Sequence, residues 1–364
     1  MNIIFHYPLP LDQNAKSASG IRPLRMLKAF IDLGYTVHLV TGYAKERRAS
    51  IKVIKANIES GIKYDFLYSE SSTMPTALTE KTHIPTHPLL DFLFIRFCHK
   101  EGIPTSLFYR DVQWKFDIYG KGLSPAKIII AKFFYRFDIF CYRHCLSCLY
   151  LPSVEMRDYI KEIKELPVRA LQPGHEVNLA TIDEDRRTQS RKLNILYVGG
   201  LSALYRMDVL VNAVERFSEV KLTICTREKD WLDARDNFPD ILPANIRIVH
   251  ASGDQLSDLY AWADVASLYL APHEYSKFAY PMKLFEYIGY CKPVLASEGT
   301  LYGSFVEKNQ IGWCVDYNLE DISDFFSHIM NNLDDVSTKK NNVRTIQTKH
   351  TWLARAQQVA EDLS

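Results

Sequence analysis

Apolar segments of strand length alternate with helical segments along this 364-residue chain, and the alternation begins twice. In the first half, the expected strands Ile3–Tyr7 and Thr36–Thr41 flank a helix from about Pro23 to Leu33. In the second half, Leu193–Gly200 is a strand that ends in two glycines, and Val220–Cys225 is the next strand. Strands that alternate with helices form parallel sheets. The sequence therefore predicts an α/β protein with two doubly wound parallel-sheet domains.

The remaining periodicity divides the chain into two parts. We expect further strands at 64–67, 105–110, 246–250 and 265–269, and further helices at 88–100, 125–148, 154–164, 208–217 and 254–263. Pro173-Gly174 and the polar run 183–192 interrupt the pattern, as turn and linker residues do. We therefore place the boundary within 167–185, so that one domain covers residues 1–170 and the next begins at residue 171.

Composition fits a folded globular protein. Hydrophobic residues make up 47% of the chain and charged residues 24%, which are ordinary values. A chain of 364 residues exceeds what one core usually organises, which again favours two domains. Long uncharged apolar runs are missing, and Met1–Phe5 lacks the basic start of a secretory leader. We therefore expect a cytoplasmic protein without a membrane span.

The seven cysteines are an odd number and are scattered through apolar segments. This pattern predicts reduced, buried thiols, as in a cytoplasmic protein. Cys141, Cys145 and Cys148 follow one another at helical spacing, so we interpret them as one face of a core helix and not as a metal cluster. The run Asp183–Asp185 has a carboxylate spacing that some enzymes use to hold a metal, but it lies in a charged linker. We expect no metal site.

The net charge of +1 conceals an asymmetry between the two halves. Residues 1–170 contain 24 Lys and Arg against 16 Asp and Glu, whereas residues 171–364 contain 20 against 27. A basic half indicates an anionic surface or ligand, and no nucleic-acid-binding motif accompanies it. Within it, the segment 124–144 interleaves cations with apolar and aromatic residues. We keep two interpretations of this segment: a core helix with a basic edge, or an interfacial helix that rests on an anionic membrane.

The segment Tyr280–Ser297 places polar chemistry at the start of a helix. Pro281 suits a first helical turn, and Lys283 and Glu286 follow three residues apart on one side. The free N–H groups of such a turn, together with Lys283, would face phosphate, and Glu286 would accept from ribose hydroxyls. The same residues also fit a surface helix with an ion pair between Lys283 and Glu286, so other features have to decide.

A turn with glycine follows the first expected strand of each half, where doubly wound sheets bind ligands. Gly199 and Gly200 let the backbone approach a phosphate, and Arg206 would supply a cation before the next helix. The pair is not a GxGxxG fingerprint, and a plain turn with a solvated arginine is the alternative. In the first half, Ser19 and Gly20 belong to a loop that would admit an acceptor or a phosphate, or is simply a surface loop.

Asp111 directly follows an expected strand, and a carboxylate in that place is a candidate general base once burial raises its pKa. Asp117 is the nearby, weaker alternative. The competing interpretation is that Arg110 and Asp111 pair on the surface. His6 ends the first strand and His175 lies between the halves. Either histidine would suit a site, although single histidines are more often structural.

These features together resemble the GT-B glycosyltransferases, and within them the family-four type of bacterial surface-polysaccharide enzymes. The likeness extends along nearly the whole chain and is strongest over 259–264 and 271–297, where Pro-x-Lys-Leu-Phe-Glu-Tyr is followed by Lys-Pro-Val. It is weaker over 169–177 and 193–214. The end of the chain, Thr351-Trp352 with the helix that follows, resembles the tail that returns to the first domain.

The resemblance implies the GT-B architecture, with two Rossmann-like domains, an interdomain cleft and a C-terminal helix that crosses back. Residues 1–170 would bind the acceptor, residues 171–345 would bind the nucleotide-sugar donor, and residues 346–364 would form the helix that packs on the first domain. We expect no metal and no cofactor, because the nucleoside-diphosphate sugar is a co-substrate and cationic side chains would neutralise its diphosphate.

The resemblance also implies site residues. The expected donor-binding residues are Gly199, Gly200, Arg206, Tyr280, Met282, Lys283 and Glu286. Glu286 would bind the ribose, and Arg206 would replace the diphosphate-binding lysine of the family. Phe278 departs from the pattern, since it stands where the family often has a glutamate that contacts the sugar. A retaining mechanism is therefore not implied. Relatives that invert use an acidic base in the first domain, where Asp111 lies.

The expected function is transfer of a hexosyl or glycuronosyl group from a nucleoside-diphosphate sugar to a glycan or lipid-linked acceptor. The product would be a bacterial surface polysaccharide, whether capsule, exopolysaccharide or lipopolysaccharide. The protein would be cytoplasmic or peripheral on the inner face of the plasma membrane. A nucleotide-sugar epimerase of the same fold and a non-catalytic sugar-nucleotide-binding subunit are the alternatives. The nucleotide base, the sugar, the linkage and the oligomeric state are left open.

Overall fold

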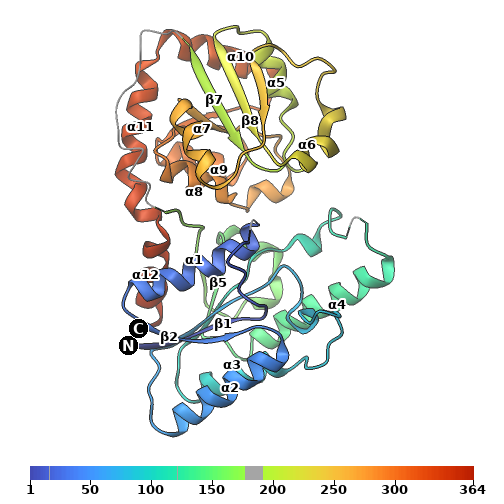
Figure 1. Cartoon of the computed structure of the whole chain (residues 1–364), viewed down its shortest axis with the longest axis vertical. Coiled ribbons are helices and arrows are strands. Elements are labelled where there is room, and N and C mark those ends of the chain that lie inside the picture. Colours follow the sequence, from blue (N-terminus) through green and yellow to red (C-terminus); the bar gives the residue numbers. More distant parts are fainter. Residues whose placement is uncertain (16, 121, 177–191) are drawn as a thin grey trace. The chain divides into compact units, whose positions relative to one another are not determined.

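The computed structural model describes residues 1–15, 17–120, 122–176 and 192–364. These residues form two units, shown in Figure 1. Unit 1 comprises Met1–Pro173 together with Trp352–Ser364, and unit 2 comprises Gly174–Thr351. The sequence placed the boundaries at 170–171 and 345–346. The chain returns to unit 1 at Trp352, later than predicted. The reason is that α11 (Asp334–Gln347) and a short 3₁₀ helix (Thr348–His350) still belong to unit 2.

Unit 1 is built on a six-stranded parallel sheet with the order β2-β1-β3-β4-β5-β6. Its strands are β1 (Asn2–Tyr7), β2 (Thr36–Thr41), β3 (Phe66–Glu70), β4 (Thr105–Phe108), β5 (Cys148–Leu151) and β6 (Val168–Ala170). Its helices are α1 (Ala18–Asp32), α2 (Ala44–Glu59), α3 (Leu90–Lys100), α4 (Pro125–Tyr142) and α12 (Trp352–Leu363). Figure 1 places α1 and α12 on one face of the sheet and α2 and α3 on the other. The strand order reverses between β1 and β3, so the carboxyl ends of these two strands flank the switch point of unit 1.

Unit 2 repeats the architecture with the strand order β12-β11-β10-β7-β8-β9. Its strands are β7 (Leu193–Val198), β8 (Val220–Cys225), β9 (Ile246–Val249), β10 (Val265–Leu268), β11 (Val294–Ser297) and β12 (Gly312–Val315). Its helices, besides α11, are α5 (Asp208–Glu215), α6 (Glu228–Ala234), α7 (Leu256–Trp262), α8 (Met282–Gly289), α9 (Leu301–Lys308) and α10 (Leu319–Asn331). The strand order reverses between β7 and β10, which is the switch point of unit 2.

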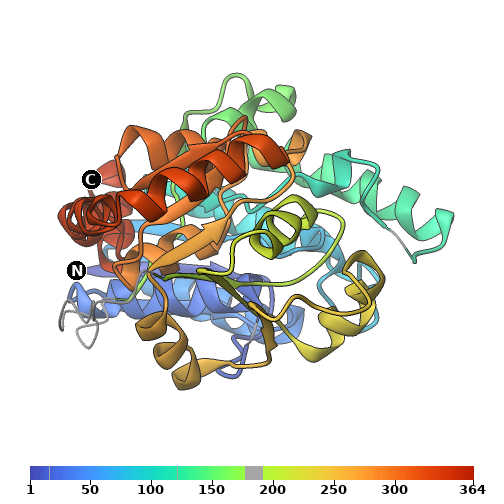
Figure 2. The same ribbon diagram turned by 90° about the horizontal axis from the view of Figure 1, so that it is seen from above.

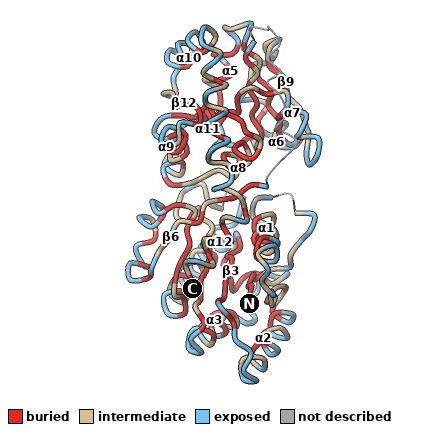
Figure 3. Tube along the Cα trace, turned by 90° about the vertical axis from the view of Figure 1, so that its left-hand side faces the viewer, coloured by how far each residue is buried: buried red, intermediate tan, exposed pale blue. Residues whose placement is uncertain are grey.

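The two parallel sheets form the buried cores of their units, as Figure 3 shows in red. Every residue of β3, β4 and β5 is buried, and β10 and β11 are buried throughout in unit 2. Strands covered by helices on both faces are expected to be apolar along their length rather than alternating. The edge strand β2 is more exposed, since it has a neighbour on one side only. The predicted fold class, two doubly wound parallel-sheet domains, is confirmed.

Several predicted element boundaries are wrong. The first helix begins at Ala18 rather than near Pro23, because the proline is accommodated inside α1. The expected strand at 64–67 lies at Phe66–Glu70. The segment 154–164 forms two 3₁₀ helices, Glu155–Tyr159 and Lys161–Ile163, in place of an α-helix.

The prediction of a shared helix face for three cysteines is also wrong. The helix expected over 125–148 ends at Tyr142. Cys141 therefore lies in α4, Cys145 in the turn after it and Cys148 in β5, so the three do not share a helix face. All seven cysteines are free thiols, and five of them are buried. Burial raises the pKa of the Cys145 thiol to about 12, which suits an inert core position.

The chain segments that connect the units meet at His175. Its backbone N–H donates to the His350 carbonyl at 3.0 Å, and residues His175 and Thr351 form a parallel bridge. The imidazole is buried, with Nε2 at 2.9 Å from the Gln347 carbonyl and Nδ1 at 2.8 Å from the Glu176 carbonyl. His175 therefore has a structural role in joining these segments.

In the part of the chain that the structure describes, no helix is long and apolar enough to cross a bilayer.

Candidate functional site

Helix α8 is anchored at the switch point of unit 2 by Tyr287. The Tyr287 hydroxyl accepts the N–H of Val198 at 3.0 Å and donates to the Ser267 carbonyl at 3.4 Å. These partners lie in β7 and β10, the two strands between which the order reverses. Pro281 is the N-cap of α8 and Met282 its first residue. The N-terminal turn of α8 therefore lies where open parallel sheets bind ligands, with its unpaired N–H groups at that edge.

The Gly199-Gly200 turn closes tightly over the end of β7. The Tyr197 hydroxyl folds back and donates to the Gly200 carbonyl at 2.7 Å. A Cβ atom at Gly199 would lie 2.6 Å from that hydroxyl, so no larger residue fits without displacing it. The Gly199 N–H donates to the Cys225 carbonyl at 2.9 Å, which ties this turn to the end of β8.

Lys283 and Glu286 lie beside the same turn. Lys283 Nζ is 3.1 Å from Glu286 Oε2, and the two side chains are 33% and 32% exposed. Burial raises the pKa of the Cys225 thiol, and the nearby charge of Lys283 lowers it while that of Glu286 raises it. Both charges are carried by α8, whose Tyr287 hydroxyl accepts the N–H of Val198, the residue before Gly199. The ion pair expected as the alternative is present, and both of its side chains are partly exposed.

Arg206 precedes α5 and is held through its backbone. Its carbonyl accepts the N–H of Ala271 at 2.9 Å and the hydroxyl of Tyr317 at 3.2 Å. Its guanidinium is 60% exposed and bonds both carboxylate oxygens of Asp208 at 3.2 Å. Among the described residues, no hydrogen bond or ion pair joins Arg206 to Lys283. The structure thus gathers Gly199, Gly200, Lys283 and Glu286, and leaves the Arg206 guanidinium paired with its own helix.

His273 links two loops of this site and was not among the expected site residues. Its Nδ1 accepts the Ser276 N–H at 3.2 Å, so the proton lies on Nε2, which donates to the Leu204 carbonyl at 3.1 Å. This contact joins the loop after β10 to the loop after β7. Burial lowers the pKa of His273, and the bond to Leu204 raises it by a smaller amount. The imidazole is therefore kept neutral, which its Ser276 bond requires.

The remaining expected donor residues contribute mainly packing. The Tyr280 ring packs edge-on against Phe285 and Phe305, with centroid distances of 5.9 and 5.8 Å. Met282 is half-buried at the start of α8. Phe278, which stands where the resemblance expected a glutamate, is 1% exposed and packs edge-on against Tyr275. That position is therefore part of the apolar core in this protein.

In unit 1, Ser19 and Gly20 lie in the first turn of α1 and not in a loop. A Cβ atom at Gly20 would lie 2.6 Å from the Cβ of Ala15, so glycine allows the preceding loop to approach the helix. Pro23 has no N–H to bond the Ser19 carbonyl. That carbonyl instead accepts from Arg110 Nη2 at 3.2 Å, which connects α1 to the end of β4.

Asp111 is half-buried just after β4. Its Oδ1 accepts the N–H of Gln113 at 3.0 Å. Burial raises the pKa of Asp111, and the Gln113 bond and the charge of Arg110 lower it by smaller amounts. The competing interpretation paired Arg110 with Asp111. In the structure Arg110 instead bonds Glu70 at 3.4 Å. Asp117 is exposed beyond the following 3₁₀ turn.

His6 takes part in a buried network that resembles a nucleophile triad only in its order. His6 Nδ1 is 2.7 Å from Ser69 Oγ, and Nε2 is 2.9 Å from Asp91 Oδ1. Arg47 also bonds both oxygens of Asp91, at 2.8 and 3.0 Å. These groups are at most 3% exposed, so no substrate reaches them. The network is structural and ties β1 to α2 and α3.

Metal ligands are not gathered in the described part of the chain. Within residues 1–15, 17–120, 122–176 and 192–364, no three His, Cys, Asp or Glu side chains lie together in a way that would hold a metal ion. The carboxylate run Asp183–Asp185 lies outside the described residues. The metal-free expectation stays a prediction.

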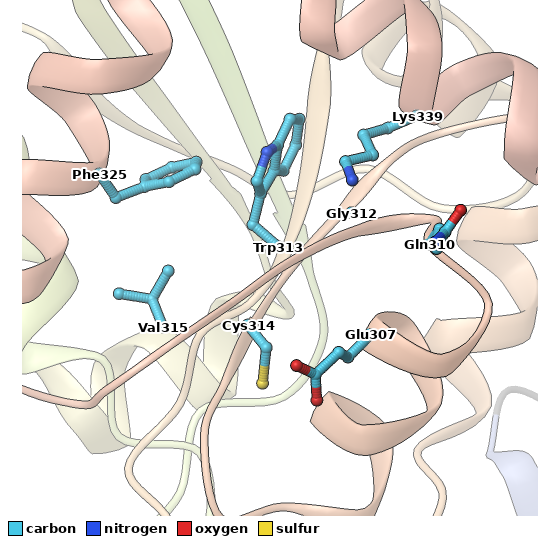
Figure 4. A pocket seen from close by; sticks show the side chains of 8 residues that line it. All are labelled: Glu307, Gln310, Gly312, Trp313, Cys314, Val315, Phe325 and Lys339. Carbon is cyan, nitrogen blue, oxygen red and sulfur yellow. The ribbon is translucent and has the colours of Figure 1, made fainter.

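A pocket of about 400 Å³ lies along the edge strand β12, between α9, α10 and α11 (Figure 4). Trp313, Cys314, Phe325 and Lys339 are among its lining side chains. Trp313 Nε1 donates to Asp335 at 2.7 Å, so the indole is fixed. None of the expected donor residues lines this pocket, and β12 is three strands away from β7. It is separate from the switch point.

Comparison with known proteins agrees with this fold. Residues 192–335 match the model of the family described as glycosyl transferases group 1. The structure of HepE from Anabaena in complex with UDP and glucose is similar over 100% of this chain and 99% of that one, at 14% identity and a TM-score of 0.63. Sucrose-phosphate synthase from Thermosynechococcus elongatus is similar over 99% and 98%, at 13% identity and a TM-score of 0.62. WaaG, a glycosyltransferase involved in lipopolysaccharide biosynthesis, is similar over 100% and 99%, at 12% identity and a TM-score of 0.56. A search of curated protein sequences finds no match.

The two doubly wound sheets have the GT-B fold, and the family match over residues 192–335 supports a glycosyltransferase that depends on a nucleotide sugar. Residues 192–335, which make up most of unit 2, resemble the glycosyl transferases group 1, in line with the expected family-four type. The predicted resemblance is confirmed.

Proposed function

We propose that the protein transfers a hexosyl or glycuronosyl group from a nucleoside-diphosphate sugar to a glycan or lipid-linked acceptor. The pathway would be the synthesis of a bacterial surface polysaccharide, and the reaction would need no metal. One observation carries the donor part of the proposal: α8, which bears the Lys283–Glu286 pair, is bonded through Tyr287 to the strand end that leads into the Gly199-Gly200 turn. The similarity to HepE with UDP and to WaaG supports the substrate class.

In this proposal the donor binds at the N-terminal turn of α8. Lys283 leaves its present partner and pairs with the diphosphate, as N–H groups of the turn also do. Glu286, released from Lys283, accepts from the ribose hydroxyls. Arg206 adds a second cation when it exchanges Asp208 for phosphate. The two cations stabilise the leaving diphosphate electrostatically, which is the task that a metal performs in other transferases.

Unit 1 receives the acceptor in this proposal. Asp111 accepts the proton of the acceptor hydroxyl if the reaction inverts, and the burial that raises its pKa brings it nearer to the range of a useful base. Asp117 is the weaker candidate, since it is exposed to solvent. The core position of Phe278 is the reason to favour a base in unit 1 over a carboxylate in the donor loop.

The test is a thermal-shift and turnover panel with UDP-, GDP- and dTDP-sugars. One family of nucleotides is expected to raise the melting temperature, because a ligand that binds only the folded state stabilises it. The same donor should release its nucleotide faster when an acceptor is added. Protection by no nucleotide, or conversion of the donor sugar to its epimer without an acceptor, would overturn the proposal.

The localisation part of the proposal rests on α4. Figures 1 and 2 show α4 on the side of its unit away from α1 and α12. Ile129, Phe133 and Phe140 are 69%, 61% and 57% exposed, and Lys127 and Arg136 are exposed on the same helix. Apolar side chains exposed beside cations are typical of helices that lie in an anionic membrane interface. We propose that α4 holds the protein on the inner face of the plasma membrane.

Vesicle co-sedimentation tests this contact. The protein should bind vesicles that contain phosphatidylglycerol, and bind phosphatidylcholine vesicles weakly. Ile129→Ser with Phe133→Ser should abolish binding, while Leu232→Ser, at an exposed leucine in unit 2, should not change it. Equal binding to both kinds of vesicle, or binding that survives the double substitution, would contradict the membrane role of α4.

A further inference from the structure

The switch point of unit 1 contains a buried ionic cluster that the donor site does not use. Glu70, the last residue of β3, is fully buried. Its Oε1 accepts the Tyr68 hydroxyl at 2.8 Å and Arg22 Nε at 3.1 Å, and its Oε2 lies 3.4 Å from Arg110 Nη2. We call Arg22, Glu70 and Arg110 the arginine cluster. It lies at the carboxyl edge of the sheet, beside the reversal between β1 and β3.

One guanidinium nitrogen of the arginine cluster lacks an acceptor. Arg22 is 3% exposed, and its guanidinium carbon lies 3.4 Å from the centroid of the Phe108 ring. Its Nη1 donates to the Gln172 carbonyl at 3.4 Å, whereas Nη2 is buried and has no hydrogen-bond partner. A buried cationic donor without an acceptor is costly, because it has lost its water and gained nothing in return. The geometry therefore provides for a further acceptor at Nη2.

The arginine cluster also carries an excess of positive charge. Among the described residues, Glu70 is the only carboxylate within ion-pair distance of Arg22 or of Arg110. Two guanidinium groups therefore share one carboxylate. Buried charges of one sign are stable only when a counter-charge accompanies them. A bound anion would supply this counter-charge.

The start of α1 lies beside the cluster. Arg110 is 11% exposed, and its Nη2 donates to the carbonyl of Ser19 in the first helical turn. Ser17, the N-cap of α1, is exposed and its hydroxyl lies 2.9 Å from that of Ser19. The charge of Arg110 also acts on Tyr7, the last residue of β1, whose pKa burial raises and Arg110 lowers. The guanidinium of Arg110, the hydroxyls of Ser17 and Ser19 and the N-terminus of α1 are all groups that favour an anion.

We propose that the arginine cluster binds an oxyanion, a carboxylate or a phosphate, that is carried by the sugar acceptor. The acceptor is then an acidic glycan or a phosphate-bearing one, and not a neutral sugar. Guanidinium groups favour these two oxyanions because their paired N–H donors match paired oxygens. The assignment of this anion to the acceptor rests on the proposed function, in which the donor occupies unit 2. The basic charge of residues 1–170, 24 Lys and Arg against 16 Asp and Glu, agrees with an anionic ligand there.

Calorimetric titration of the full chain tests this assignment. Glucuronate and glucose 6-phosphate are each compared with glucose, so that the carboxylate and the phosphate are read separately, and UDP is titrated in its own experiment. At least one of the two acids should bind about tenfold or more tightly than glucose. Arg110→Gln should remove that preference and leave the affinity for UDP unchanged. Arg22→Gln should do the same if its circular dichroism shows a folded chain.

The matched control is Arg48→Gln, since Arg48 is exposed on α2 in the same unit. It should keep the preference for the acids. Equal binding of glucose and both acids, or a preference that survives Arg110→Gln, would overturn the proposal. If Arg110→Gln weakens UDP as much as the acids, the anion is the donor diphosphate and the assignment to the acceptor is wrong. If the unaltered protein binds the acids but not UDP, the proposed donor site is overturned and the anion site is still supported.

Discussion

Asp138 in α4 provides a quantitative test of the core of unit 1. The carboxyl is 3% exposed, and its Oδ2 accepts the N–H of Thr76 at 2.7 Å. Its Oδ1 is buried and has no hydrogen-bond partner. Burial raises the pKa of Asp138 to about 8, the bonds from Thr76 oppose the shift, and the charge of Asp91 adds to it. Asp138 is therefore protonated in the folded chain at neutral pH.

The sign of the pH dependence follows from this shift. Between pH 5 and pH 8 the side chain is ionised in the unfolded chain and protonated in the folded one, so unfolding releases a proton. Stability from this group therefore falls as pH rises. Each pH unit in that window costs about 1.4 kcal/mol, which gives about 4 kcal/mol over the window. Below the unfolded pKa both states are protonated and the penalty vanishes.

Asp138→Asn removes the titration and keeps an oxygen that can accept from Thr76. The free energy of unfolding of the variant, relative to the unaltered protein, should rise by about 4 kcal/mol between pH 5 and pH 8. For a unit of this size that is roughly 8–16 °C in the melting temperature of unit 1. Differential scanning calorimetry at the two pH values measures it. Asp158→Asn, at an exposed carboxylate of the same unit, is the control. Parallel pH profiles for the Asp138→Asn variant and the unaltered chain would refute the reasoning.

Three further predictions concern the site residues. Gly199→Ala should lower the stability of unit 2 by about 1–3 kcal/mol, measured by denaturant unfolding, and should weaken UDP binding, because its Cβ would strike the tyrosine hydroxyl that closes the turn. Gly200→Ala should have a smaller effect, since its Cβ would lie 3.1 Å from the nearest atom. Burial lowers the pKa of His273, so its contribution to stability is complete above the usual pKa of about 6.5 and is lost as pH falls below it. His273→Gln should remove that acid sensitivity, and unchanged melting profiles from pH 7.5 to 5.5 would contradict it. Asp111→Asn should lower kcat about 100-fold or more with UDP affinity unchanged, and a larger loss in Asp117→Asn would transfer the role.

The fold could be predicted because its signals are local. Apolar runs of strand length and turns with glycine recur along the chain, and each is decided by neighbouring residues. The helix and strand boundaries that were predicted wrongly depend on contacts with residues far away in the sequence. Helix α1 continues through Pro23 because the carbonyl that the proline leaves without an N–H is taken by Arg110 from the end of β4. No pattern in the α1 segment alone reveals that partner.

The candidate site divides in the same way. The spacing of Lys283 and Glu286 within one helix was visible in the sequence, and so was their ability to pair. The role of His273 was not, because its two partners come from its own turn and from a loop about 70 residues earlier. The arginine cluster was missed for a similar reason. Arg22, Glu70 and Arg110 are each ordinary in sequence, and only the parallel order of β1, β3 and β4 brings them together.

The central claim is that the Lys283–Glu286 pair at the start of α8 binds the nucleotide of the donor. Calorimetric titration of UDP, or of whichever nucleotide the donor panel selects, tests it most directly with Lys283→Gln and Glu286→Gln. Each substitution should weaken binding about tenfold or more, since each removes a charge-assisted contact. Lys308→Gln, at an exposed lysine of α9, should leave the affinity as it is. Affinities within twofold of the unaltered protein in both variants would contradict the account.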